Sequence, residues 1–377
     1  MGKRLGHSSD RIAELLGDKR HVASRSTNTV EIQGRKLELS NLDKVLYPEV
    51  GFTKGQVIDY YVRIAQVLLP HLRDRPLTMK RYPNGVTGQF FYEKNCPKHR
   101  PEWVQTAAIW SEGNNRYMNY CLAQDLPTLV WAANLADLEL HTSLSLAKDI
   151  LRPTMMVFDL DPGPPATIVQ CCQVGVWLKA VFDAFGLKTF AKTSGSKGLQ
   201  VYVPLNTPVT YDDTKSFAHE LARLLEREHP QLVVSDMKKS LRVNKILVDW
   251  SQNDDHKTTV CVYSLRAKDH PTVSTPVTWE EVQRTLAKGD PKLLVFETQD
   301  VLGRVEKMGD LFAPVLELKQ KLPKIEALRS AKLEKRSVPV PAITKAAKPT
   351  RASKPPRTAA TKRAARPVKS TKKKKRV

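Results

Sequence analysis

The sequence lacks the features that mark membrane-spanning and secreted proteins. No run of 18 apolar residues is present to cross a bilayer, and the N-terminus has no signal-peptide core. The chain has five cysteines, an odd number, and none of them forms a Cys-x-x-Cys pair. Cysteine usage of this kind is typical of a reducing compartment. We therefore expect a cytoplasmic protein with no membrane partner.

Several local motifs are also missing or incomplete. The Walker A pattern GxxxxGK[ST] is absent, and so is the Lys-x-Asp-Gly motif of a ligase nucleophile. Cys96-Pro-Lys-His99 could be half of a zinc site, but no second half is evident, so we interpret it as a loop. Cys171 and Cys172 are adjacent within a helical pattern and are predicted to pack in the core rather than form a bridge.

Charge is distributed unevenly along the chain. The net charge is +22, and residues 331–377 alone hold 17 Lys/Arg against one acidic residue. This segment has almost no aromatic or large apolar side chains, so it cannot bury enough surface to fold alone. We expect a polar N-terminal extension over 1–28, a folded domain over 29–328 and a disordered Lys/Arg-rich tail over 329–377. Such a basic chain predicts a polyanionic partner, most simply nucleic acid.

Hydrophobic periodicity and turn residues predict both helices and strands. A helix begins after Thr53, with Gln56 in the capping-box position, and is expected to end at Pro70. Residues 111–119 are predicted to be a polar loop. Further helices are predicted after Pro127, over 168–185, over 212–228 and, in pieces, from Trp279 to about Leu328. Strands are predicted as a hairpin over 30–39 and at 188–192, 199–205, 245–248 and 259–265.

A short apolar strand ends in two carboxylates. Residues 155–158, Met-Met-Val-Phe, have no helical period and lead into Asp159-Leu160-Asp161-Pro162-Gly163. Side chains alternate along a strand, so Asp159 and Asp161 share one face, and Pro-Gly ends the strand. Hard oxygen ligands at that spacing suit Mg²⁺ or Mn²⁺. A solvated strand and turn explains the same residues, since Asp-Pro-Gly is ordinary turn chemistry.

Three other stretches carry polar or aromatic groups suited to a nucleic acid site. The loop over 193–198, Thr-Ser-Gly-Ser-Lys-Gly, can present backbone N–H groups and a cation to phosphates. A tight hairpin explains its glycines, but not its lysine and hydroxyls together. Asp249 follows another apolar strand as a third acid. Over 75–95, basic residues interleave with aromatics, as in a groove that tracks a nucleic acid strand, although a strand-turn-strand with core aromatics fits equally well.

Seven motifs, in this order, resemble the polymerase domain of bacterial DNA ligase D, within the archaeo-eukaryotic primase superfamily, over about residues 30–325. They are Asn41-Leu42-Asp43-Lys44-Val45-Leu46-Tyr47-Pro48, Arg75-Pro76-Leu77 through Arg81-Tyr82-Pro83-Asn84-Gly85, Glu139-Leu140-His141, Phe158 to Gly163, Thr193 to Gly198, Val248 to Asn253 and Tyr263-Ser264-Leu265-Arg266. The resemblance implies an α/β (α+β) fold with a primase-like core, a mostly antiparallel sheet flanked by helices. It also implies nucleotide addition to DNA 3′ ends and gap filling during non-homologous end joining.

Position by position, the resemblance assigns roles to side chains. The metal ligands would be Asp159, Asp161 and Asp249, holding two divalent ions, Mn²⁺ or Mg²⁺. The nucleotide contacts would be His141, Ser194, Lys197, Gln200, Gln252 and Arg266. A pocket for the 5′-phosphate of a downstream DNA strand would use Asn41, Lys44 and Lys54, with Lys54 in a helix first turn whose free N–H groups favour an anion. Further DNA contacts would come from Arg81, Phe90, Phe91 and Lys94.

One position departs from the family, which usually has His where this chain has Gln200. Gln donates a hydrogen bond but cannot carry charge, so triphosphate affinity or nucleotide preference is expected to differ. The resemblance implies several partners: DNA ends and gapped DNA with a 5′-phosphate, NTP or dNTP, a Ku-type end-binding protein and, because the ligase motif is absent, a separate ATP-dependent DNA ligase. It also implies a nucleoid-associated location.

Two alternative functions remain. A catalytically silent DNA-end-binding scaffold would explain the basic charge, but it has no use for clustered carboxylates that repel DNA. A primase would share the chemistry, but the residues for the 5′-phosphate pocket and the absence of a zinc module disfavour it.

Overall fold

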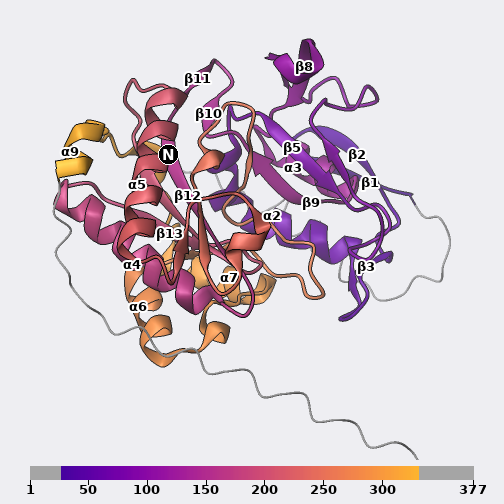
Figure 1. The fold of residues 1–377 in the computed structure, drawn as a ribbon. Helices are drawn as coiled ribbons and strands as arrows, with labels where there is room; N and C mark the ends of the chain where they lie inside the picture. The colour runs from indigo at the N-terminus through magenta and orange to yellow at the C-terminus, as the bar shows by residue number, and fades with distance from the viewer. Residues whose placement is uncertain (1–26, 331–377) are drawn as a thin grey trace, which may run out of the picture. The chain divides into compact units, whose positions relative to one another are not determined.

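A computed structural model describes residues 27–330, which contain two six-stranded sheets with helices packed on them (Figure 1). We call the first the β12 sheet. Its strand order is β15 (Val233–Val234), β16 (Ile246–Asp249), β12 (Met155–Pro162), β14 (Leu199–Pro204), β13 (Phe190–Thr193) and β18 (Pro276–Val277). Every pairing in it is antiparallel except the one between β15 and β16.

We call the second sheet the β5 sheet. Its order is β17 (Thr259–Val260), β9 (Asp137–Thr142), β5 (Leu77–Arg81), β8 (Arg116–Cys121) and β7 (Thr106–Ser111), with β6 (Phe91–Glu93) paired to β5. Three two-stranded pairs complete the strands of the described residues. They are β1 (Thr27–Ile32) with β2 (Arg35–Ser40), β3 (Val45–Tyr47) with β4 (Phe52–Thr53), and β10 (Ser145–Leu146) with β11 (Asp149–Pro153).

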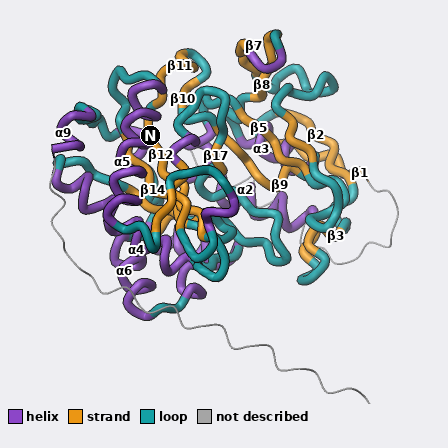
Figure 2. Tube along the Cα trace, viewed as in Figure 1, coloured by secondary structure: helices purple, strands orange, loops and turns teal. Residues whose placement is uncertain are grey.

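Helices cover each sheet and bury a separate apolar core. Those near the β5 sheet are α2 (Lys54–Leu72) and α3 (Leu126–Asn134), and those near the β12 sheet are α4 (Ile168–Ala184), α5 (Tyr211–Glu228) and α6 (Trp279–Lys288). The chain ends its described part with α7 (Thr298–Met308), α8 (Pro314–Glu317) and α9 (Ile325–Ser330). Figures 1 and 2 show α4, α5 and α6 beside β12 and its neighbours, with β5, β9 and α3 on the other side. Two clusters of buried side chains fill these two parts.

The helix starts follow from their capping residues. At α2, Thr53 Oγ1 accepts from the N–H of Gln56 at 3.3 Å, and Gln56 Oε1 accepts from the N–H of Thr53 at 2.8 Å. The same reciprocal arrangement begins α4, α5 and α6 at Thr167, Thr210 and Thr278. Each satisfies N–H groups that have no partner inside the helix.

The predicted fold class, a primase-like α/β core with mostly antiparallel sheets, is confirmed, while three local predictions were wrong. Pro70 does not end α2, which continues to Leu72 because a proline in the last turn forfeits only one hydrogen bond. The strand predicted over 259–265 stops at Val260, and the chain then turns through Tyr263, which has φ of 65°. The predicted loop over 111–119 is mostly strand, since β7 and β8 form a hairpin around a short turn.

The predicted N-terminal extension and C-terminal tail lie almost entirely outside the described residues, so those boundaries stay predictions. Within residues 27–330, no helix combines the length and apolar character needed to cross a membrane.

Candidate functional site

The acids predicted from the sequence lie in a row of polar residues that crosses the β12 sheet. Asp159 on β12 is directly opposite Asp249 on β16 and Gln200 on β14. Gln200 is in turn opposite Lys192 on β13. Residues opposite one another in antiparallel strands project from the same face, so these four side chains share one face. Asp161, two residues beyond Asp159, projects from that face as well.

The electrostatics of these acids favour a cation. Burial raises the pKa of Asp159 to about 7, and the charges of Asp161 and Asp249 add to the effect. Burial, followed by the charge of Asp249, also raises the pKa of Asp161. Asp159 Oδ1 is buried and has no hydrogen-bond partner among the described residues. Neighbouring carboxylates with an unsatisfied oxygen fit a divalent metal ion. Such an ion would reduce the repulsion between the carboxylates and would give the unsatisfied oxygen a partner.

Asp249 is oriented by the residues that follow it. Its Oδ1 accepts from the N–H of Ser251 at 2.9 Å and from Ser251 Oγ at 2.7 Å, and its Oδ2 accepts from Gln252 Nε2 at 2.9 Å. Gln252, which the resemblance assigned to the nucleotide, is thus bonded to a predicted metal ligand.

A second group of ligand atoms lies in the loop after β16. Asp254, Asp255 and His256 each offer one atom, and these atoms lie within 4.8 Å of one another. Asp254 already pairs with Lys215 Nζ at 2.6 Å, and His256 is exposed. The sequence analysis did not single out this group, although three adjacent ligand-type residues are visible in the sequence. It is not part of the polar row around Asp159.

The loop over 193–198 is a tight hairpin pressed against the acid strand. Ser194 Oγ accepts from the N–H groups of Ser196 and Gly198 at 3.2 and 3.1 Å, so two N–H groups that we predicted could face a phosphate already have a partner. A Cβ atom at Gly198 would lie 2.2 Å from the carbonyl oxygen of Leu160, so only glycine allows this approach. Lys197 is exposed at the tip of the loop, and its charge lowers the pKa of Asp161 against the dominant effect of burial.

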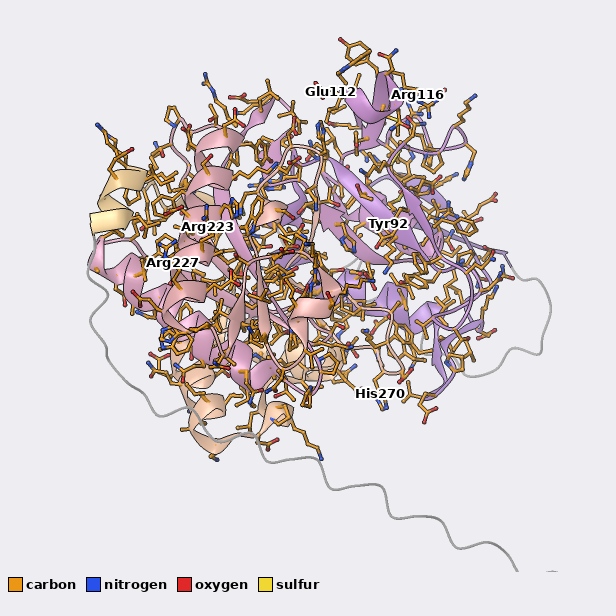
Figure 3. All side chains as sticks on the ribbon, viewed as in Figure 1. Tyr92, Glu112, Arg116, Arg223, Arg227 and His270 are labelled. Atoms are coloured by element: carbon orange, nitrogen blue, oxygen red, sulfur yellow. A yellow bond between two sulfur atoms is a disulfide. The ribbon has the colours of Figure 1, made fainter. Side chains whose placement is uncertain are left out.

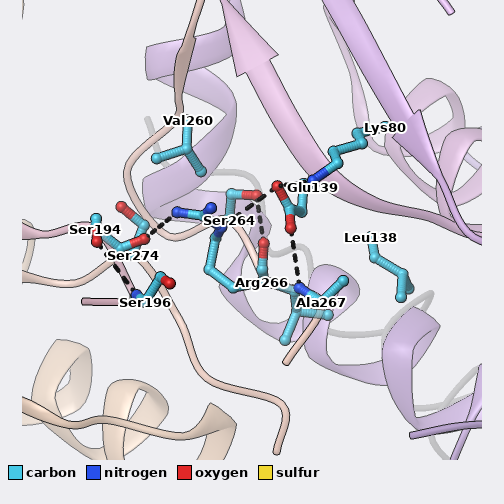
Figure 4. A network of polar contacts seen from close by, with 12 residues as sticks. Lys80, Leu138, Glu139, Ser194, Ser196, Val260, Ser264, Arg266, Ala267 and Ser274 are labelled. Atoms are coloured by element: carbon cyan, nitrogen blue, oxygen red, sulfur yellow. Dashed lines mark hydrogen bonds and ion pairs between the residues drawn. The ribbon is translucent and has the colours of Figure 1, made fainter. Parts of the chain in front are cut away.

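Arg266 reaches this loop, and Glu139 on β9 of the other sheet connects it to His141 (Figure 4 shows Arg266, Ser194 and Glu139). The guanidinium of Arg266 donates to the carbonyl oxygen of Ser194. It also forms an ion pair with Glu139, whose Oε2 lies 3.4 Å from Arg266 Nε and 3.0 Å from His141 Nε2. The structure therefore brings Ser194, Arg266 and His141 together, and places Glu139 among them.

The lysines predicted to bind a 5′-phosphate lie close enough to influence each other. Lys54 is buried, and its Nζ donates to the carbonyl oxygen of Ser40 at 2.6 Å. Burial and, to a smaller extent, the charge of Lys44 together lower the pKa of Lys54 to about 8. Lys44 is exposed and donates to Asn84 Oδ1 at 3.3 Å. Neither lysine forms an ion pair with a carboxylate within residues 27–330, and Asn41, with φ of 53°, accepts from the N–H of Lys44 at 3.1 Å.

One part of that prediction was wrong. The N–H groups at the start of α2 are not free, because those of Lys54 and Gly55 donate to the carbonyl oxygens of Lys44 and Leu42, each at 2.8 Å. The preceding loop folds back over the helix end and uses them. Any anion held here must therefore be bound mainly by the lysine side chains.

The predicted DNA contacts fall into two kinds. Phe90 and Phe91 are about half exposed and available to a ligand. Arg81 is tied into the protein, donating to the carbonyl oxygen of Leu135 at 3.0 Å and to Glu93 Oε2 at 2.5 Å. Lys94 Nζ lies 3.5 Å from the carbonyl oxygen of His256.

Sequence reasoning also missed three residues of this region. Tyr92 is 58% exposed and lies over the strands of the β5 sheet (Figure 3), and the run Phe-Phe-Tyr could have indicated it. Lys80 Nζ lies 4.6 Å from the ring centre of Phe90 and 5.4 Å from that of Tyr92. Lys192 is fully buried, and its Nζ donates to Ser274 Oγ at 2.6 Å. Only the register of β13 with β14 brings Lys192 into the polar row, and no sequence signal gives that register.

The cysteines differ in part from expectation. Cys171 and Cys172 are buried in α4 without a bridge, which confirms the prediction that they pack in the core. Cys96, interpreted as part of a plain loop, forms a disulfide with Cys121, and the two Cα atoms are 5.1 Å apart, within the range for such a bond. The two residues are 25 positions apart in sequence, and the pairing of the loop after β6 with β8 brings them together.

Comparison with known proteins agrees with this arrangement. A family model described as "LigD, primase-polymerase domain" matches residues 53–312. The "Multifunctional non-homologous end joining protein LigD" of Mycolicibacterium smegmatis is 40% identical over 311 residues, which are 81% of this chain and 40% of the relative. The "Bifunctional non-homologous end joining protein LigD" of Bacillus subtilis is 33% identical over 275 residues, 73% of this chain and 43% of the relative. The chain thus spans about two fifths of the length of these relatives.

Among solved structures, the "Polymerase Domain from Mycobacterium tuberculosis Ligase D in complex with DNA" superimposes with a TM-score of 0.69 and 38% sequence identity. The match covers 75% of this chain and 99% of that chain. With the fold, the acid row and these relatives in agreement, the chain belongs to the LigD primase-polymerase domain family.

Proposed function

We propose that this protein is a template-directed nucleotidyltransferase that adds nucleotides to DNA 3′ ends and fills gaps during non-homologous end joining. The observation that carries the proposal is the meeting of three carboxylates with three cations. Asp159, Asp161 and Asp249 share one face of the β12 sheet, and the charges of Arg242, Arg266 and Lys197 all act on Asp161. Family membership supports the chemistry, and the printed names of the relatives support the repair process.

The three acids would hold two divalent ions, Mg²⁺ or Mn²⁺, which when bound acidify a primer 3′-hydroxyl and neutralise phosphate charge. Lys197 and Arg266 would bind the triphosphate and stabilise the charge that shifts to the leaving pyrophosphate. His141, Ser194 and Gln252 would complete the nucleotide pocket. Gln200, opposite Asp159, would contact the phosphates without adding charge.

The DNA would be bound by residues of the β5 sheet and of the region around the start of α2. Lys44 and Lys54 would bind the 5′-phosphate at the far edge of a gap, with Asn41 alongside. The exposed rings of Phe90 and Phe91 would stack on bases of the template, a contact that tolerates any sequence. Arg81 would act indirectly, by holding β5 and β6 together through its ion pair with Glu93. Lys94 would contact the phosphate backbone of the DNA.

The likeness to a DNA-bound polymerase domain supports DNA as the substrate. A Ku-type end-binding protein and a separate ATP-dependent DNA ligase would be its partners, at DNA ends in the cytoplasm and nucleoid. The basic segment over 331–377, outside the described residues, would add binding to DNA without sequence preference.

Primer extension on gapped DNA tests the proposal, with ribo- and deoxynucleotides and with Mg²⁺ and Mn²⁺ in separate reactions. Template-directed extension of the primer supports it. A scaffold would bind the same DNA without extending it, and a primase would start strands without a primer.

A further inference from the structure

The carboxylate of Glu139 on β9 lies at the centre of a converging set of donors. It is 2% exposed. Its Oε1 accepts from the N–H of Ala267 at 3.1 Å and from the Tyr82 hydroxyl at 3.4 Å. Its Oε2 lies 3.0 Å from His141 Nε2. The same oxygen lies 3.4 Å from both Lys80 Nζ and Arg266 Nε (Figure 4).

These neighbours keep Glu139 ionised. Burial alone would raise the pKa of Glu139, but the hydrogen bond from His141 and the charges of Arg266 and Lys80 together lower it well below its usual value. A single buried anion therefore balances several cationic or donor groups, which would otherwise repel one another.

The groups around Glu139 belong to two parts of the proposed site. Arg266 and His141 are candidate nucleotide contacts, and Arg266 continues to the carbonyl oxygen of Ser194 in the loop beside the acids. Lys80 instead lies under the exposed rings of Phe90 and Tyr92 on the proposed DNA-binding face. Glu139 thus connects side chains that approach a nucleotide from the β5 sheet.

We infer that Glu139 is a positioning residue for nucleotide binding, which fixes the directions of Arg266 and His141 without touching the nucleotide itself. This inference rests on the proposed function. A carboxylate is required because both of its oxygens only accept. In Glu139→Gln, the amide oxygen could still accept from Ala267 and Tyr82, but the amide NH₂ would then face His141, Lys80 and Arg266. Arg266 would lose its ion pair and keep only its hydrogen bond to the carbonyl oxygen of Ser194.

The test is a titration of a nucleoside triphosphate with Mg²⁺, together with steady-state extension, on the wild type and Glu139→Gln. We expect nucleotide Kd and KM to rise about tenfold in the variant, with a much smaller change in kcat. Glu281→Gln is the matched control. Glu281 forms an ion pair with Arg304 at 2.6 Å outside the pocket, so this control should leave nucleotide affinity unchanged.

A double-mutant cycle separates positioning from general destabilisation. Because Glu139 is inferred to position both Arg266 and His141, the loss of affinity in the double variant Glu139→Gln, Arg266→Ala should be clearly smaller than the product of the two single losses. Wild-type affinity in Glu139→Gln, or losses that multiply in the double variant, would overturn the inference. If Glu139→Gln proves insoluble, Glu139→Asp, which keeps the charge on a shorter side chain, enters the same cycle with the same criteria. Because the titration measures binding, its result stands apart from whether the wild type extends primers.

Discussion

Asp159 and Asp249 face each other directly across the antiparallel pair of β12 and β16. Both are acidic, and burial with neighbouring negative charge raises the pKa of Asp159 to about 7. Two partly buried carboxylates at this spacing repel each other when no cation is present. The arrangement therefore costs folding free energy in the absence of a cation, which fits the proposed metal site.

The first prediction concerns that cost. Asp159→Asn removes a carboxyl that is about half ionised at pH 7, with almost no change in shape, so the apo protein should become more stable. We expect its Tm in chelator at pH 7 to rise by a few degrees, while added Mn²⁺ should stabilise the variant less than it does the wild type. Thermal unfolding with and without Mn²⁺ measures both effects. A lower Tm in chelator together with an undiminished Mn²⁺ response would contradict the metal assignment.

The second prediction concerns Gln200, which is buried between Asp159 and Lys192 in the polar row. Gln200→His would place a group that can carry a proton beside the proposed triphosphate site. We expect nucleotide affinity to increase several-fold, because a charged donor binds a phosphate oxygen more strongly than a neutral amide does. Titrating triphosphate with Mg²⁺ tests this, and unchanged or weaker binding would remove the functional meaning of this departure from the family.

Strand alternation is enough to predict that Asp159 and Asp161 share a face, because it is a local property of the chain. The sequence does not reveal which residues lie opposite them, since the register with β14 and β16 is set by long-range pairing. The sequence shows Asp249 as a third acid after a strand, but only the family resemblance implies its grouping with Asp159 and the role of Gln200, and neither indicates Lys192. The donors around Glu139 also come from three separate segments. The fold class was predictable because periodicity and motif order extend over the whole domain.

The third prediction concerns the pair Lys44 and Lys54. Because neither has a carboxylate partner among the described residues, a dianionic 5′-phosphate would neutralise both. We expect the wild type to bind and fill gaps with a 5′-phosphate better than matched gaps with a 5′-hydroxyl. In the double variant Lys44→Ala, Lys54→Ala, the ratio of gap filling with a 5′-phosphate to gap filling with a 5′-hydroxyl should fall by about tenfold or more. Simple primer-template extension should be retained. If the wild type treats the two ends alike, the pocket does not exist.

The fourth prediction follows from the pKa of Lys54, which burial lowers to about 8. A lysine with a lowered pKa loses its charge as pH rises through that value, whereas the phosphate, with a second pKa of about 6, stays dianionic. The preference for 5′-phosphate should therefore be strong at pH 7 and decline as pH rises through 8 toward 9. Lys54→Arg, whose guanidinium stays charged, should remove the decline. If the preference is independent of pH in both the wild type and Lys54→Arg, Lys54 does not bind the phosphate.

Extension of a primer across a gap with a 5′-phosphate, with Mn²⁺, tests the central claim most directly. The wild type should add the nucleotides that the template specifies. Asp249→Ala should lose extension by several orders of magnitude while binding the same DNA within a few-fold, because its carboxylate lies at the proposed metal site and not on the proposed DNA-binding face. Template-directed extension by Asp249→Ala at a rate near that of the wild type, or none by a folded, DNA-bound wild type, would contradict the account.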